Sequence, residues 1–288
     1  MTSRLLHLTI KNNSGSIEHF YHFVLGYLLP LGSYMTRERI SEDRVMLLCS
    51  CGPFDRLMQE LALPGLILCE RQTHAKSKAM ILRLADADVD EIRGFDFGQL
   101  PEDQVVYDFA GVGAGIAFVR QRLALAIAEA RRAIETDWVG SPRILLIERG
   151  EPDPFYASPI CYDINPIFRT AGKQRWMIGN HAALAAPLAG SYPGLRNVIL
   201  EGMPLAAQIA LFERADVVIA QHGAALANVI WMRPDAGVVE IDPNSNSFVF
   251  TNLARLSGLR YQRIGQPGGD FGDVSIDEVV ATVGRMVA

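Results

Sequence analysis

Cysteine is scarce in this chain, and its spacing excludes two common uses of the residue. The 288 residues include Cys49, Cys51, Cys69 and Cys161, which are too few and too irregularly placed for the disulfide framework of a small secreted protein. No C-x-x-C pairs occur at zinc-binding spacing. We therefore expect reduced and mostly buried thiols.

Long uncharged apolar runs and blocks of Lys and Arg are also absent. The start of the chain, MTSRLLHLTI, lacks a basic segment followed by a long apolar run, and no stretch is long enough to span a bilayer. These absences predict a cytoplasmic protein without a transmembrane segment. The formal net charge is −5 with no basic block, so nucleic acid is not an expected partner and individual basic residues must bind any phosphate.

The order of the expected elements predicts an α/β protein with two Rossmann-like domains, whose mostly parallel sheets face a central cleft. We expect an N-terminal domain at residues 1–115, a connecting helix at 116–140 and a C-terminal domain at 141–288. The ligand should lie between the two domains. No element is predicted within 71–108, and the proline-rich residues 151–166 should form an irregular loop over the cleft.

The glycines at 111, 113 and 115 resemble a dinucleotide-binding triplet, but their spacing is too narrow and the required later acidic residue is not evident. A flexible turn between domains is the favoured interpretation. An NAD-dependent oxidoreductase, which would need the triplet to follow a strand, is the third functional hypothesis.

The most informative stretch is residues 201–243, which predicts a helix, a strand, a turn, a second helix and a second strand in succession. The run DVVIA that begins at Asp216 is apolar and β-branched without alternation, as in a strand of a parallel sheet that is covered on both faces. Gln221, His222 and Gly223 follow it, and a helix begins at once. Such a turn places free N–H groups at the carboxyl edge of the sheet, where anions bind.

This stretch resembles the signature region of glycosyltransferase family 61. The residues on the family pattern are His222, Gly223, Ala224, Asn228, Glu240 and Pro243. The resemblance implies an inverting glycosyltransferase of the GT-B type that moves a sugar from a nucleotide sugar to a saccharide hydroxyl, in polysaccharide or glycan biosynthesis. The implied co-substrate is linked to uridine diphosphate, and neither a cofactor nor a metal is predicted.

We expect both backbone N–H groups and a positively charged side chain to bind the donor diphosphate. The N–H groups of Gly223 and Ala224, together with His222, can stabilise the leaving group, and a side chain at position 223 would keep the backbone away from a phosphate. Arg149, at the end of a predicted strand, is the expected cation.

Further donor-binding residues are implied by the resemblance alone. Arg175 and Asn180 resemble a family segment, and Asn228 belongs to the signature. His181 stands where the family more often has Glu.

Two of the signature residues have plainer alternatives. Glu240, at the end of a buried strand, either binds the ribose hydroxyls, as the resemblance suggests, or caps the next helix. His222 either contacts the ligand or is a core histidine bonded to a backbone carbonyl.

Inversion requires a base that takes the proton of the acceptor hydroxyl. His22 is the candidate, with His19 and Glu18 behind it and Asp108 as a further possibility. Packing of His22 in the core and metal binding by the His19 and His22 pair are the alternatives. The D-x-D at 86–88 is interpreted as a solvated face rather than a metal site.

The second functional hypothesis is a non-catalytic nucleotide- or glycan-binding protein of the same fold. It would keep the diphosphate site but lack a working base. The tryptophans at 138, 176 and 231 are interpreted as packing residues.

Overall fold

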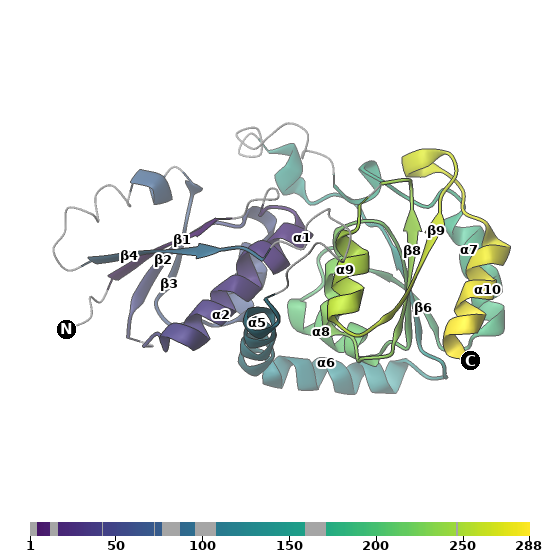
Figure 1. Ribbon diagram of the computed structural model, residues 1–288, viewed down its shortest axis with the longest axis horizontal. Coiled ribbons are helices and arrows are strands. Elements are labelled where there is room, and N and C mark those ends of the chain that lie inside the picture. Colours follow the sequence, from purple (N-terminus) through teal and green to yellow (C-terminus); the bar gives the residue numbers. More distant parts are fainter. Residues whose placement is uncertain are drawn as a thin grey trace. The chain divides into compact units, whose positions relative to one another are not determined.

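The computed structural model describes residues 5–11, 17–41, 43–71, 73–76, 87–95, 108–158, 171–245 and 247–288. These residues fall into two compact units. The first comprises residues 5–95 and 108–124 within those ranges, and the second comprises residues 125–288. Each unit contains one parallel sheet (Figure 1), which confirms the predicted α/β class with two Rossmann-like units.

The strands and helices follow one another in alternation along most of the described chain. The strands are β1 (Leu5–Lys11), β2 (Val45–Cys49), β3 (Leu66–Cys69), β4 (Ala87–Arg93), β5 (Ile144–Glu148), β6 (Leu195–Ile199), β7 (Val217–Gln221), β8 (Gly237–Asp242) and β9 (Arg260–Gly265). The longer helices are α1 (Phe20–Phe23), the π-helix η1 (Val24–Leu28), α2 (Leu29–Glu38), α3 (Asp55–Glu60), α5 (Phe109–Arg122), α6 (Ala124–Asp137), α7 (His181–Ser191), α8 (Leu205–Arg214), the 3₁₀-helix η8 (Ala224–Trp231), α9 (Val249–Leu256) and α10 (Ile276–Val287).

The sheet of the first unit has the order β3-β2-β1-β4, and all of its described pairs are parallel. Strand β4 was not predicted, because its sequence ADVDEIR carries a charge at four of seven positions. Charged side chains are common on edge strands, where they protect the open edge. Asp88 pairs with Arg44, and Asp90 accepts a hydrogen bond of 2.8 Å from the Tyr34 hydroxyl. The expectation of no element within 71–108 is therefore wrong for residues 87–93, whereas the Asp88 side chain is 52% exposed, as the interpretation of a solvated face predicts.

Helix α1 begins at Phe20, and His19 is its N-cap residue. Pro30 lies near the start of α2. It has no N–H to donate, and its ring would clash with the carbonyl four residues before it in a regular α-helix. The chain widens into η1 just before this proline, and the Leu29 N–H bonds to the Val24 carbonyl, five residues back. The Leu25 carbonyl accepts a 3.0 Å hydrogen bond from the Phe95 N–H instead.

The helix expected at 116–140 is two helices, α5 and α6, which meet at Leu123, and the first unit includes all of α5. No proline or glycine marks the break. The Arg122 side chain donates to the carbonyls of Leu61 and Ala62, so the end of α5 is held in the first unit by contacts that are remote in sequence.

The glycine triplet lies inside α5, so both the flexible turn and the dinucleotide loop are wrong. Asp108 is the N-cap of this helix and accepts a 2.8 Å hydrogen bond from the Gly111 N–H. Gly115 packs directly on the backbone of α2 at Leu29. The absent side chain allows two helices to approach closely.

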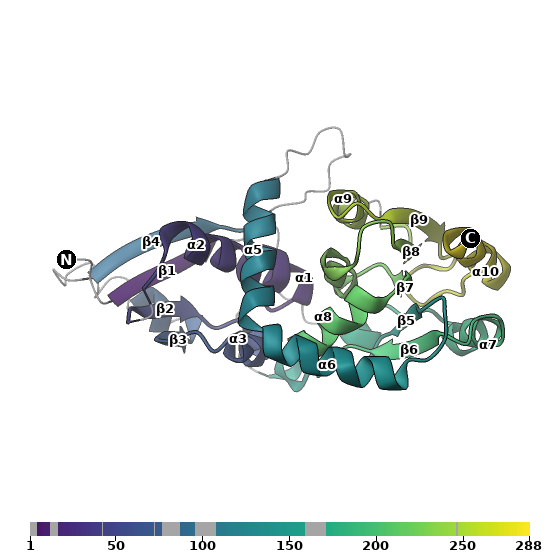
Figure 2. The ribbon, with the colours of Figure 1, turned by 90° about the horizontal axis from the view of Figure 1, so that it is seen from below.

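The sheet of the second unit has the order β6-β5-β7-β8-β9, again with parallel pairs throughout the described strands. Alternate side chains of β5, β7 and β8 pack with α7 and α10 on one face. Helices α8 and α9 lie on the other face (Figures 1 and 2). The chain leaves β5 toward β6 and returns to β7 on the other side of β5, which makes the β5/β7 edge the topological switch point of the sheet.

Two further expectations can be compared with the described residues. Cys49, Cys51 and Cys69 are free thiols, and Cys161 lies outside the described residues. Across the part of the chain that the structure describes, no single helix is long and apolar enough to cross a membrane, although α5 and α6 together meet the same criteria as a broken pair.

The close approach of α2 and α5 gives a prediction about stability. Gly115→Ala should lower the free energy of unfolding by about 1–3 kcal/mol, because the added Cβ meets the Leu29 backbone. Gly113→Ala, two residues away in the same helix with no atom of the described residues within 4 Å of the added Cβ, should raise that free energy by about 0.5–1 kcal/mol. Chemical denaturation of both variants measures the difference, and equal effects would contradict the packing.

Candidate functional site

A cavity of about 220 Å³ lies at the carboxyl ends of β5 and β7, on the side of the sheet covered by α7. This is the switch point, where ligands of open parallel sheets bind. The cavity is lined by Ile147, Glu148, Arg149, Lys173, Met177, Ile178, His181 and Gln221. It therefore combines two cations and several acceptors with an apolar wall.

The strand-to-helix turn after β7 is fixed by Arg149. Its Nη2 donates a 2.7 Å hydrogen bond to the His222 carbonyl. A Cβ at Gly223 would collide with this guanidinium, and the φ of Gly223 is +152°, which other residues rarely adopt. The contact with Arg149 and the backbone conformation therefore both require glycine here. The reason predicted from the sequence, backbone access to a phosphate, is a third one and stays a prediction.

Trp176 lies between the charged groups of the site. The guanidinium carbons of Arg149 and Arg175 are 5.5 Å and 4.6 Å from the Trp176 ring centre, and the His222 ring centre is 5.4 Å away. A cation against an aromatic face is stabilised by the ring quadrupole. The interpretation of Trp176 as a packing residue, like the buried Trp138 and Trp231, missed this arrangement.

Burial makes both arginines costly to protonate. Burial lowers the pKa of Arg149 to about 10; the charge of Glu201 opposes this shift and that of Arg175 adds to it. The pKa of Arg175 is also lowered by burial. Arg149 nevertheless remains protonated at neutral pH. A polyanionic ligand would offset this unfavourable proximity of charges.

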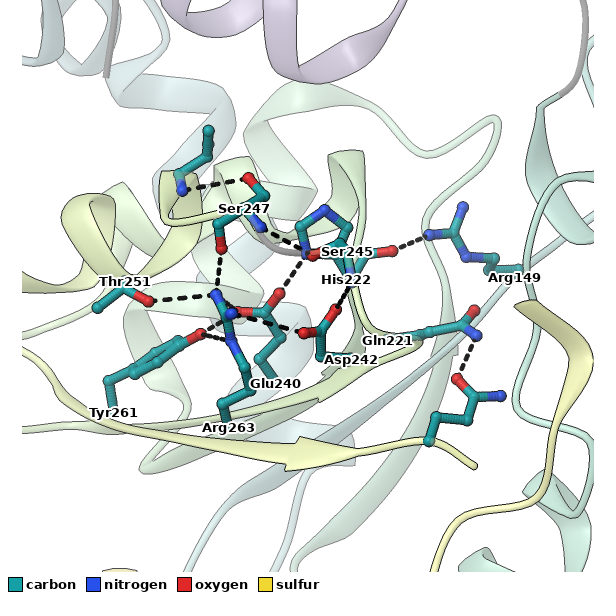
Figure 3. Close-up of polar contacts among 12 residues, drawn as sticks. Arg149, Gln221, His222, Glu240, Asp242, Ser245, Ser247, Thr251, Tyr261 and Arg263 are labelled. Atoms are coloured by element: carbon teal, nitrogen blue, oxygen red, sulfur yellow. Dashed lines mark hydrogen bonds and ion pairs between the residues drawn. The ribbon is translucent and has the colours of Figure 1, made fainter. Parts of the chain in front are cut away.

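His222 and Gln221 are adjacent in sequence but serve opposite faces of the sheet, because side chains alternate along a strand. Gln221 lines the cavity near Arg149, whereas His222 lies near Glu240, Asp242 and Ser245 (Figure 3).

Glu240 is fully buried, and both of its oxygens are engaged. One bonds His222 Nδ1 and the other accepts from the Tyr261 hydroxyl. Arg263 lies 3.9 Å from the Glu240 carboxylate and 3.5 Å from that of Asp242. In this structure Glu240 orients the His222 ring, as carboxylates do for functional histidines. Its contact with a ribose stays a prediction.

Three of these groups could hold a divalent cation. The ligand atoms of His222, Glu240 and Asp242 lie within 4.8 Å of one another. Arg263 already supplies a positive charge to both carboxylates, and the Tyr261 hydroxyl occupies one oxygen of Glu240. The nitrogen and carboxylate oxygens of this group are atom types that bind metals. The positive charge that a metal would bring to the two carboxylates is already supplied by the Arg263 side chain.

Two predicted donor-binding residues have structural partners. The Asn180 side chain donates to the Val274 carbonyl at 2.9 Å and accepts from the Val274 N–H at 3.0 Å. Asn228 is fully buried, and its amide bonds Gln208 and Trp231. Asn180 thereby ties the start of α7 to the backbone at Val274, and Asn228 ties η8 to the Gln208 side chain of α8. Direct ligand contacts by either residue stay predictions.

The candidate base residues belong to the first unit. Glu18 is buried and forms an ion pair of 2.6 Å with Arg71, and His19 is buried at the N-cap of α1. His22 lies in the last turn of α1 and is half-buried. Asp108 serves as a helix cap. Of this set, His22 is the histidine that retains partial exposure.

Sequence reasoning missed Trp176, Lys173 and Gln221. Lys173 and Trp176 lie beside a segment that gave no periodic signal, and Gln221 precedes the conspicuous His222. Its position was the usable signal, because Gln221 directly follows a predicted buried strand, at the edge of the sheet where ligands bind.

The sequence matches the family model Glycosyltransferase 61 over residues 20–239. No curated protein matches it significantly. Among solved structures, the chain is similar to the crystal structure of the glycosyl transferase family 9 from Veillonella parvula DSM 2008. That match has 10% identity and a TM-score of 0.45, and it covers 99% of this chain and 97% of the other.

The geometry at Gly223 predicts a local defect. Gly223→Ala should displace the Arg149 guanidinium and lower the free energy of unfolding by about 2–4 kcal/mol, from backbone strain and the lost charged hydrogen bond. Gly265→Ala, at the end of β9 where no atom in the described part of the chain lies within 4 Å of the added Cβ, is the matched control and should be nearly neutral. Thermal or chemical unfolding compares them; a neutral Gly223→Ala would show that Arg149 does not occupy this position.

His181 predicts a pH dependence. Burial lowers its pKa below 6.5, so the unfolded chain takes up a proton first as the pH falls through 6.5. Below that pH the His181 contribution to stability is progressively lost; above it the contribution is fully present. His181→Phe should reduce the loss of stability between pH 7 and 5, measured by denaturation at each pH. An unchanged slope would contradict a neutral, buried ring.

Proposed function

Because this chain belongs to glycosyltransferase family 61, we propose that it is an inverting transferase that moves a sugar from a nucleotide sugar to a hydroxyl of a saccharide acceptor. The family establishes glycosyl transfer. The GT-B arrangement, the donor linked to uridine diphosphate, and a role in polysaccharide or glycan synthesis form the finer part of the proposal.

The observation that carries the donor assignment is the convergence of cations at the switch point. Arg149 and Lys173 line the cavity, and Arg175 shares the Trp176 ring with Arg149. Burial lowers the pKa of both arginines, and the charge of Arg175 lowers that of Arg149 further, so an anion placed at Arg149 relieves repulsion as well as gaining hydrogen bonds. A diphosphate supplies such charge and suits the fork geometry of guanidinium groups.

These groups can stabilise the leaving group during transfer. As the bond from the anomeric carbon to the diphosphate breaks, negative charge grows on the phosphate oxygens. Charges that are fixed before the reaction stabilise that change without having to reorganise. Arg149 is fixed by its bond to the His222 carbonyl, and His222 is fixed by Glu240. The Gly223 and Ala224 N–H groups are the proposed backbone donors.

For the proton of the acceptor hydroxyl we retain His22 of the first unit as the proposed base. It is half-buried, whereas Glu18 is already paired with Arg71 and His19 is buried. An imidazole titrates near neutral pH and can accept this proton.

The test separates transfer from binding alone. His22→Ala should keep the affinity for a nucleoside diphosphate within about twofold and lower kcat by about 10²- to 10⁴-fold, the usual contribution of a general base. Arg149→Met should instead weaken that affinity by about 10-fold or more. Calorimetry and release of nucleoside diphosphate from nucleotide sugars measure the two effects. Binding without turnover in the wild type would indicate a non-catalytic binding protein.

We also propose that transfer uses the cations of the chain and requires no metal. Activity should then survive dialysis against EDTA, with less than about a twofold change. If EDTA abolishes activity and a divalent cation restores it, the metal proposal is wrong, and the cluster of His222, Glu240 and Asp242 becomes the place to look. Asp242→Asn would then lower the affinity for that cation.

A further inference from the structure

Two hydrogen-bond acceptors in the switch-point cavity have no donor among the described residues. Gln221 is 4% exposed and donates through Nε2 to the Gln266 side chain at 2.6 Å and to the Asp270 carbonyl at 3.2 Å. Its Oε1 is buried without a partner among those residues. Both N–H bonds fix the amide, so this oxygen cannot turn away.

The second acceptor is His181, the first residue of α7. Its ring donates to the Ile147 carbonyl, and its Nε2 is buried without a partner in the described part of the chain. Since burial lowers the pKa of His181, the ring is neutral at neutral pH, and Nε2 carries the lone pair. Buried acceptors are nearly always satisfied in native proteins, so two of them on residues that line one cavity indicate a ligand with donors.

The neighbouring groups define what that ligand is. Glu148 adds a third acceptor, and Lys173 adds a donor, while Ile147, Met177 and Ile178 form an apolar wall. Phosphate oxygens only accept hydrogen bonds, so they suit the Arg149 guanidinium rather than these three acceptors. A sugar ring has hydroxyl groups, which donate and accept, and C–H surfaces, which suit an apolar wall. The volume of about 220 Å³ lies below the ~300–1,000 Å³ of pockets that enclose whole ligands, so one part of the donor enters.

We propose that this cavity binds a sugar ring of the nucleotide-sugar donor, with Gln221 Oε1 and His181 Nε2 accepting hydrogen bonds from two of its hydroxyl groups. The inference rests on the proposed function, because it takes the anionic part of the donor to lie at Arg149. The ring is either the ribose of the nucleotide or the sugar that is transferred. Gln221 and His181 are then specificity residues, which read the hydroxyl pattern of the donor.

The experiment measures affinities by calorimetry for Gln221→Leu and His181→Phe. Gln262→Leu, the same change at an exposed position of β9, is the control and should bind like the wild type. The probes are the diphosphates of uridine, guanosine, cytidine and adenosine. The tightest binder is then compared with its 2′,3′-dideoxy analogue and with its glucose, galactose, N-acetylglucosamine and xylose conjugates. Thermal unfolding checks each fold, and the two variants are independent tests.

Two outcomes support the proposal and identify the ring. If it is the ribose, each variant loses about 3- to 10-fold in affinity for the diphosphate but matches the wild type with the dideoxy analogue. If it is the transferred sugar, the variants match the wild type with the diphosphate and lose about 3- to 10-fold with a conjugate.

Two other outcomes overturn it. Sugar recognition is contradicted if the variants bind every probe like the wild type. It is also contradicted if they lose as much affinity for the dideoxy analogue as for the diphosphate. Both results leave the proposed function in place. If the wild type binds none of the nucleotides, the proposed function itself fails, and this inference fails with it.

Discussion

The hydrogen bond from the Arg149 guanidinium to the His222 carbonyl is the contact on which the geometry of the site depends. It joins the end of β5 to the turn after β7, across the switch point of the sheet. It also occupies the space that a side chain at position 223 would need. A charged hydrogen bond of this kind contributes about 1.5–3 kcal/mol, which is large relative to the stability of a domain. The same guanidinium is thereby held in place for a ligand.

The alternation of side chains along β7 divides the site into two parts with different chemistry. On the α7 side, Gln221 shares a cavity with cations and with acceptors that have no partner among the described residues. On the α9 side, His222 contacts Glu240 and, at 4.9 Å between ring centres, Phe250. The first part is open to a ligand, and the second is a satisfied network that orients one ring. Two consecutive residues therefore have separate roles, because a strand directs them to opposite faces.

Local sequence was sufficient for those features that depend on neighbouring residues. The buried strands β7 and β8, the glycine of the turn and the cation at the end of β5 were all predicted, since apolar runs and their polar ends are visible in the chain. The break at Leu123 and strand β4 were missed. The break depends on Arg122, which donates to carbonyls about 60 residues away in sequence. Strand β4 shows no alternation of apolar and polar residues that would predict a strand, because it carries the charges typical of an edge strand. The contacts of Trp176 with Arg149 and His222 were not predicted, because both partners lie far from it in sequence.

The most direct measurement is a crystal structure of the protein with a bound nucleoside diphosphate. The account predicts phosphate oxygens within hydrogen-bonding distance of the Arg149 guanidinium and the Gly223 N–H, with the His222 ring still held by Glu240. A diphosphate bound elsewhere, for example at Arg71 in the first unit, would contradict it. So would a complex in which Arg149 leaves the His222 carbonyl to reach the ligand.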